Sequence, residues 1–171
     1  NREPAQRVAE DIRSLGRNAL LVKANIAELD DIDLLFSTIK KEFGGLDFYI
    51  HNAASGYKRP VMQQRLKGWE WTLNINARSL LFSAQHAVPL MEKRGGGAIV
   101  TISSPGAGRV LPDYVVVGAS KAAIESITRY LAVELSPKNI VVNAVSPGMV
   151  LTDALQHFEM VRSDVHLAEK A

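Results

Sequence analysis

Short apolar runs alternate with segments of helical hydrophobic period along this chain, and this alternation restricts the fold more than any other feature. The apolar runs lie at 19–22, 46–50, 98–102 and 140–145. Helical spacing is found over 4–15, over 32–43, from a polar loop at 51–60 to about Glu92, and over 114–135. Apolar strands of this kind between helices predict a doubly wound α/β fold, with a parallel sheet covered on both faces.

The composition excludes several classes of protein and site. With 171 residues, and at about 150 residues per domain, the chain is expected to form one domain. The net charge of +2 and the absence of long Lys/Arg clusters argue against a nucleic-acid partner. Without cysteine, and with only four scattered histidines, we expect no disulfide and no metal site. No apolar run approaches the ~18 residues of a membrane-spanning helix.

Ligands of doubly wound folds bind beyond the carboxyl ends of the strands, so the loops after the apolar runs are the place to search for a site. Three of these loops carry small or hydroxyl residues, at 51–56, 103–108 and 146–148. Each has a plain structural explanation as well, because glycine, proline and serine are also the residues of ordinary turns. No single loop identifies a function.

Taken together, these loops and the helix that carries Tyr114 and Lys121 resemble the second half of the short-chain dehydrogenase/reductase family. The family pattern has an Asn-Ala-Ala loop, a helix Asn, a strand followed by Ser, a Tyr and Lys on one helix, and Pro-Gly-Thr. The matching residues here are Asn52, Ala53, Ala54, Asn76, Ser104, Tyr114, Lys121, Pro147, Gly148 and Thr152. Their separations fit as well, with 28 residues from Asn76 to Ser104 and 17 from Ser104 to Lys121.

The resemblance assigns roles to these residues. It implies a nicotinamide cofactor whose adenosine side lies along residues 52–54 and whose ribose is held by Lys121. Pro147, Gly148 and Thr152 are implied to border the nicotinamide. For Ser104 two roles remain equal, one in catalysis beside the tyrosine and one in shaping its loop.

The position of the tyrosine points to one branch of the family. Most members have Tyr four residues before the Lys, where this chain has Val117, whereas Tyr114 stands seven residues before Lys121. That spacing resembles the spacing in the enoyl-acyl-carrier-protein reductases. The amino-acid sequences of residues 69–77, 130–138 and 152–155 are similar to those of their bacterial, NADPH-dependent type III form. The resemblance implies reduction of trans-2-enoyl thioesters on acyl carrier protein during fatty acid elongation, with Tyr114 stabilising or protonating the enolate.

Helix geometry is compatible with this chemistry. Seven residues turn a helix by about 700°, so Tyr114 and Lys121 are expected within about 20° of one face. Their axial separation is about 10 Å, against about 6 Å for a spacing of four. In enoyl reduction hydride attacks the β-carbon while charge develops on the thioester oxygen several bonds away, which suits a hydroxyl displaced from the nicotinamide.

Two other functions remain open, namely another family reductase acting on a ketone or alcohol, and a non-catalytic member of the family. We expect His51 to be a hydrogen-bonded structural residue and Asn76 to have a supporting role. The resemblance further implies a cytoplasmic homodimer or homotetramer that associates through its two long central helices.

Two parts of the family pattern are missing from the sequence. The family begins with a strand and a glycine-rich turn that binds the cofactor pyrophosphate, then a second strand, and it ends with a further strand. The chain is therefore expected to be part of a longer protein. It would form a partial Rossmann-like domain that contains strands 3 to 6 of the family order. Strands 1 and 2, which separate strand 3 from strand 4 in that order, are absent.

Overall fold

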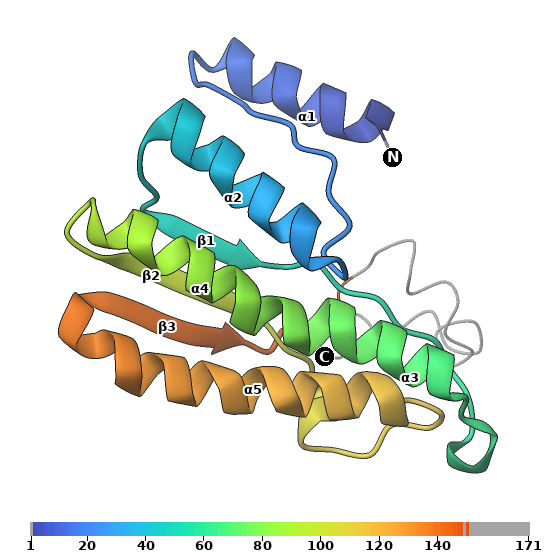
Figure 1. Cartoon of the computed structure of the whole chain (residues 1–171). Coiled ribbons are helices and arrows are strands. Elements are labelled where there is room, and N and C mark those ends of the chain that lie inside the picture. Colours follow the sequence, from blue (N-terminus) through green and yellow to red (C-terminus); the bar gives the residue numbers. More distant parts are fainter. Residues whose placement is uncertain (1, 149, 151–171) are drawn as a thin grey trace.

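The computed structural model describes residues 2–148 and 150, and Thr152 lies outside them. The helices are α1 (Arg2–Ser14), α2 (Leu29–Phe43), α3 (Leu66–Leu73), α4 (Ser79–Glu92) and α5 (Val115–Leu135). The strands are β1 (Phe48–His51), β2 (Gly97–Ile102) and β3 (Ile140–Val145). A π-helical segment, Asn74–Arg78, joins α3 to α4, so the expected long helix is one rod with a widened turn (Figure 1).

The three strands form a parallel sheet in the order β1-β2-β3, which confirms the predicted Rossmann-like α/β fold. Ile50 of β1 is paired with Val100 of β2, and Val100 with Asn143 of β3. Because the strands are parallel and in step, their carboxyl ends meet at one edge of the sheet. The loops that the sequence singles out therefore gather at that edge.

The predicted strand at 19–22 is wrong. This segment belongs to an irregular stretch between α1 and α2, and Figure 1 shows it as a coil. A β-strand exists through hydrogen bonds to a neighbouring strand. The sheet of the described residues consists of β1, β2 and β3, and none of them pairs with residues 19–22, so this backbone joins no ladder despite its apolar composition.

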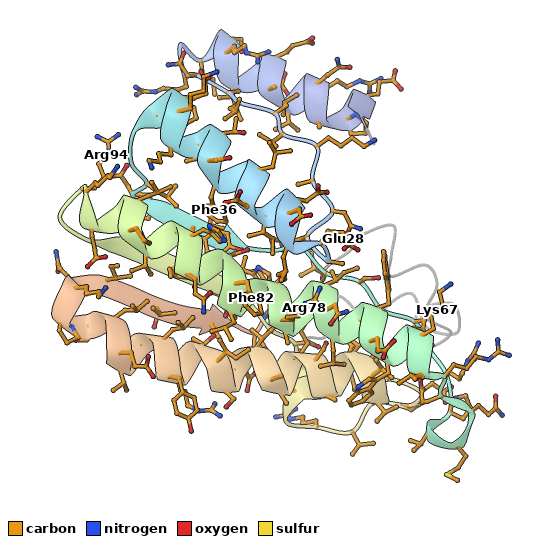
Figure 2. All side chains as sticks on the ribbon, viewed as in Figure 1. Glu28, Phe36, Lys67, Arg78, Phe82 and Arg94 are labelled. Atoms are coloured by element: carbon orange, nitrogen blue, oxygen red, sulfur yellow. The ribbon has the colours of Figure 1, made fainter. Side chains whose placement is uncertain are left out.

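One face of the sheet carries the core. Helices α2, α4 and α5 pack there, around buried side chains that include Phe36, Met91 and Ile99. The ring of Phe36 meets Tyr49 of β1 edge-on at 5.7 Å between centroids, and Figure 2 places Phe36 between α2 and β1. On the other face Phe48 and Ile50 are 71% and 63% exposed. The sequence predicts helices on both faces of the sheet, but within the described residues helices cover only one face.

The helix ends follow the sequence signals. Gly16 and Gly44 have φ of 73° and 74°, the left-handed conformation that ends a helix at little cost for glycine. The Gly44 N–H donates to the carbonyl of Lys40 and closes α2. Among the helices described between residues 2 and 148, none has the length and apolar character needed to span a lipid bilayer.

Candidate functional site

Tyr114 and Ser104 meet at the carboxyl edge of the sheet. Ser104 follows β2, and Tyr114 is the N-cap residue immediately before α5, with φ −102° and ψ 7°. The Tyr114 hydroxyl donates a hydrogen bond to Ser104 Oγ over 3.3 Å. Ser104 Oγ also accepts the Gly106 N–H, so this hydroxyl shapes its own loop while it contacts the tyrosine. The loop-shaping role expected for Ser104 thus has a structural basis, and its role in catalysis stays a prediction.

Two glycines make room for the tyrosine ring. A Cβ at Gly106 would lie 2.6 Å from Cδ1 and Cε1 of Tyr114, far inside van der Waals contact. A Cβ at Gly118, one turn along α5, would lie 2.7 Å from the Gly106 carbonyl oxygen and 3.7 Å from Tyr114 Cδ1. The ring therefore sits against bare backbone, and its position depends on the absence of side chains at 106 and 118.

Lys121 brings a nearly buried cation to the end of β2. Its side chain lies on α5, only 7% of the residue is exposed, and Nζ donates to the carbonyl of Ile102 over 2.7 Å. Burial lowers the pKa of Lys121 from its ordinary value, because the charged form loses hydration. An ammonium has three donors, and the contact with Ile102 uses one of them. Hence this group has donors left for a hydroxyl-rich ligand.

Val117 occupies the position where most of the family has its tyrosine. It is buried, and its Cγ2 would lie 2.3 Å from a Cβ placed on Gly56. The loop after β1 thus closes directly onto Val117.

Residues 52–54 are exposed after β1, and the loop is held immediately beyond them by Asn76. The Asn76 side chain is fully buried and accepts the Ser55 N–H at 2.8 Å while donating to the Ser55 carbonyl at 2.9 Å and to Ser120 Oγ at 2.8 Å. Trp71 adds a bond from Nε1 to Ser55 Oγ. The supporting role predicted for Asn76 is confirmed, whereas Ser55, Trp71 and Ser120 had no sequence signal.

The loop after β3 lies beside the Ser104 loop. The Ser103 N–H donates to the carbonyl of Val145 over 2.7 Å and ties the two strand ends together. Pro147 is partly exposed and Gly148 exposed, so both are accessible to a ligand at this edge. The third member of the predicted nicotinamide border, Thr152, lies outside the described residues.

His51 is a structural residue, as predicted. It is 2% exposed, with Nε2 at 2.9 Å from the Asn76 carbonyl and Nδ1 at 2.9 Å from the Tyr49 hydroxyl. A carbonyl only accepts, so Nε2 carries the proton and Tyr49 donates to Nδ1. Burial lowers the pKa of His51 and raises that of Tyr49 to about 12, so both groups are neutral. No acid–base role follows for either.

Among residues 2–148 and 150, no three His, Asp or Glu side chains gather as a set of ligands. The groups at the carboxyl edge are instead a phenol, a serine hydroxyl and an ammonium. Such a set can bind hydroxyl groups and stabilise a developing oxyanion.

Comparison with known proteins assigns this arrangement to a family. A family model described as Enoyl-(Acyl carrier protein) reductase matches residues 1–170. The chain belongs to this family of short-chain dehydrogenases/reductases.

Relatives within the family carry different names. The chain is 36% identical over 152 residues to the hydroxynaphthalene reductase-like protein Arp2 of Metarhizium robertsii, covering 88% of this chain and 56% of that protein. It is 34% identical over 158 residues to the 1-cyclohexenylcarbonyl-CoA reductase of Streptomyces collinus, covering 92% of this chain and 56% of that protein. The chain thus spans little more than half the length of these relatives.

A solved structure shows the same fold. The enoyl-(acyl-carrier-protein) reductase from Anaplasma phagocytophilum, in complex with NAD, superposes with a TM-score of 0.82 at 33% identity. The match covers 94% of this chain and 62% of that one.

Proposed function

We propose that the protein reduces the carbon–carbon double bond of trans-2-enoyl thioesters with hydride from NADPH. The observation that carries the proposal is the placement of Tyr114 at the start of α5, seven residues before Lys121 and bonded to Ser104, while Val117 is packed under Gly56. The names of two relatives are in agreement. One is an enoyl-(acyl-carrier-protein) reductase, and 1-cyclohexenylcarbonyl-CoA is itself an α,β-unsaturated thioester.

The residues present fit a nicotinamide cofactor, which supplies the hydride when bound. Lys121 holds spare N–H donors at the carboxyl edge, where ribose hydroxyls are the acceptors that they would bind. The small exposed residues Ala53 and Ala54 allow a flat adenosine to approach the backbone. Pro147 and Gly148 lie across the edge, on the loop tied to Ser103. The choice of NADPH over NADH is taken from the type III resemblance.

Tyr114 acts on the substrate rather than on the cofactor. Hydride transfer to the β-carbon leaves negative charge on the thioester oxygen, and a proton then adds to the α-carbon to give the saturated thioester. A phenol that donates a hydrogen bond to this oxygen stabilises the charge where it develops. Ser104 keeps the phenol oriented in the free enzyme through the 3.3 Å bond, and the buried Lys121 adds a positive charge near the strand end.

The setting of the activity follows from the same proposal. The thioester is carried on acyl carrier protein, and the reaction completes a cycle of fatty acid elongation in the cytoplasm. Self-association through the central helices is expected, as a homodimer or homotetramer. Exposed apolar side chains on these helices, Trp69, Tyr130 and Val133, are available for such a contact.

A second function, reduction of a ketone, is favoured by one contact. The hydroxyl groups of Tyr114 and Ser104 lie within hydrogen-bond distance of each other, and together they could donate to the oxygen of a ketone substrate. A hydroxynaphthalene reductase-like relative is among the similar proteins. The two functions differ in where charge appears relative to the carbon that receives hydride.

Parallel assays of the intact protein separate the two functions. Loss of NADPH absorbance with a crotonyl thioester alone supports enoyl reduction, and loss with an acetoacetyl thioester alone refutes it in favour of ketone reduction. Inactivity with both supports the non-catalytic alternative. Repeating the assay with NADH tests the cofactor.

Two variants test the assigned roles. Tyr114→Phe removes one oxyanion donor and is expected to lower kcat by about 10²–10³-fold with cofactor affinity retained. Lys121→Ala should weaken cofactor binding as well. A Tyr114→Phe enzyme with normal turnover would remove this residue from the mechanism.

A further inference from the structure

Side chains of α5 and its N-cap are bonded to four successive residues at the end of β2. The four pairs are Thr101–Thr128, Ile102–Lys121, Ser103–Glu125 and Ser104–Tyr114. Lys121, Glu125 and Thr128 fall within an arc of about 60° around the helix, so they form one stripe that faces the strand end. Three of the four pairs belong to the buried strand or to the proposed site, and the Ser103–Glu125 pair has no role assigned so far.

The Ser103–Glu125 pair differs from the others because its acceptor is a carboxylate. The Ser103 side chain is buried, and its hydroxyl donates to Glu125 Oε1 over 2.6 Å. A hydrogen bond to an ionised acceptor is shorter and about twice as strong as one between neutral groups. Other buried hydroxyls of α5, those of Ser120 and Thr128, donate to backbone carbonyls instead. A neutral acceptor is thus enough to satisfy a hydroxyl here, and the carboxylate makes a stronger link than burial requires.

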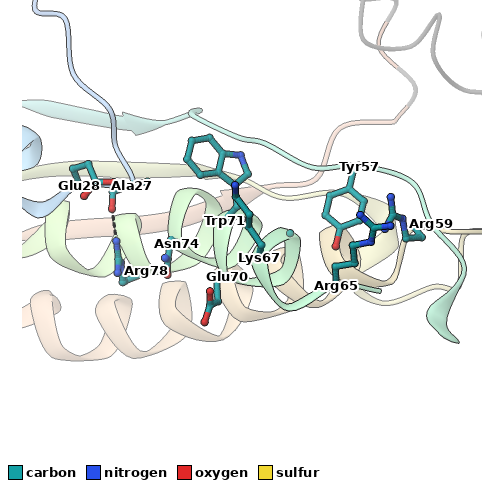
Figure 3. A pocket seen from close by; sticks show the side chains of 11 residues that line it. Ala27, Glu28, Tyr57, Arg59, Arg65, Lys67, Glu70, Trp71, Asn74 and Arg78 are labelled. Atoms are coloured by element: carbon teal, nitrogen blue, oxygen red, sulfur yellow. Dashed lines mark hydrogen bonds between the residues drawn. The ribbon is translucent and has the colours of Figure 1, made fainter. Parts of the chain in front are cut away.

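Two other glutamates near this edge form no such link. Figure 3 shows Glu28 and Glu70 at a cavity of about 580 Å³ beside α3. Both residues are exposed, and neither carboxylate has a hydrogen-bond partner among the described residues. Glu125 is half-buried and directed at the strand end. Its bond is therefore specific to the place where β2 enters the Ser104 loop.

Ser103 stands between the two residues whose contacts define the proposed site. The Ile102 carbonyl before it accepts the bond from the lysine, and the Ser104 hydroxyl after it accepts the bond from the phenol. Both are joined to Ser103 by planar peptide units, so a rotation of its backbone moves the carbonyl and the hydroxyl together. The Ser103 N–H is fixed by the carbonyl of Val145, and its hydroxyl is fixed by Glu125.

Glu125 acts through this bond rather than through its charge on Lys121. The two residues are one helical turn apart, but no ion pair joins them in the part of the chain that is described. Burial lowers the pKa of Lys121, whereas a carboxylate beside the ammonium would raise it. A neutral acceptor of similar size is therefore expected to replace Glu125 in large part.

We propose that Glu125 is a positioning residue, which fixes Ser103 and thereby holds Ser104 and the phenol of Tyr114 in line with the thioester oxygen. This inference rests on the proposed function. Glu125 itself touches neither substrate nor cofactor in the proposal. Its effect is therefore expected in turnover, because a misplacement of about 1 Å in a reacting group can cost about 100-fold.

The test compares two substitutions of Glu125 with a control on the same helix. Glu125→Ala removes the acceptor, and Glu125→Gln keeps a carbonyl acceptor without the charge. Glu134→Ala removes an exposed carboxylate of α5 that has no hydrogen bond among the described residues. Each intact protein is assayed with NADPH and a crotonyl thioester for kcat, KM and the pH profile of kcat. Amide hydrogen exchange of residues 103–108 is measured as well, because it needs no turnover.

Glu125→Ala is expected to lower kcat by up to about 100-fold, with KM and NADPH affinity close to the wild type, and to speed exchange in the 103–108 loop. Glu125→Gln should recover most of the turnover with an unchanged pH profile, and Glu134→Ala should resemble the wild type. In a Tyr114→Phe background, Glu125→Ala should cost little more, because residues that act as one unit are not additive.

Three results overturn the positioning proposal. These are normal turnover in Glu125→Ala, an equal loss in Glu125→Gln, which would show an effect of charge, and a loss that is as large without the Tyr114 hydroxyl as with it. Unchanged exchange in Glu125→Ala also overturns it, whichever substrate the enzyme uses. A wild type that reduces no crotonyl thioester instead overturns the proposed function, and exchange then still tests whether Glu125 fixes the loop.

Discussion

The packing of the Tyr114 ring against Gly106 can be tested with one substitution. A methyl group added at position 106 should displace the phenol while leaving its chemical structure unchanged. In Gly106→Ala the new Cβ lies 2.6 Å from two ring carbons and 3.3 Å from Leu111 Cδ1. Carbon atoms prefer separations of about 3.5–4.0 Å, so the ring must retreat by about 1 Å. A misplacement of that size can lower turnover by about 100-fold.

The assay compares this variant with Gly108→Ala in the same loop. A Cβ at Gly108 meets nothing within 4 Å, and its φ of −115° suits alanine. We expect Gly106→Ala to lose kcat on a crotonyl thioester while KM and NADPH affinity stay close to the wild type. Gly108→Ala should retain kcat. Equal kcat for the two variants would refute the reasoning that bare backbone at 106 positions the phenol.

Two further predictions concern stability. Because burial lowers the pKa of His51, the unfolded chain takes up a proton below about pH 6.5 more readily than the folded protein does. Stability is therefore complete above that pH and falls with acidification, by up to about 1.4 kcal/mol per pH unit, until the pH reaches the folded-state pKa. Denaturant unfolding of His51→Asn should show a flatter pH dependence, and an unaltered slope contradicts the assignment. Asn76→Ala should destabilise the protein by about 1–3 kcal/mol for each buried partner that it leaves unpaired, Ser55 above all. Asn74→Ala, in the same π-helical segment and without a side-chain hydrogen bond among the described residues, is its control, and equal loss from both variants would contradict the network.

Local patterns predicted most of the fold. Three of the four expected strands and all four expected helical segments are present, because apolar periodicity reports which face of an element is buried. The strand predicted at residues 19–22 does not form, for a reason that lies outside this segment. Its apolar residues are suited to a strand, but strand formation needs a partner backbone.

For the candidate site, too, the sequence predicts some features and only the structure shows others. Spacing along the chain singles out Ser104, Tyr114 and Lys121 as candidates, and it distinguishes this chain from family members that have a tyrosine at the position of Val117. It could not show that Lys121 bonds to Ile102, since the hydrogen bond depends on how α5 packs beside β2. Nor could it find the Ser55–Asn76 pairing, which joins residues 21 positions apart.

By itself the sequence determined the order of strands and helices, the family resemblance and the identity of the chemical groups, because periodicity and spacing are properties of neighbouring residues. Only the tertiary structure decided how those groups are held. Gly56 lies against Val117, Gly106 leaves space for the Tyr114 ring, and the Arg59 N–H donates to the Asp113 carbonyl. Each of these contacts joins different elements, and close packing between elements depends on the exact volume of side chains that sequence patterns treat as interchangeable.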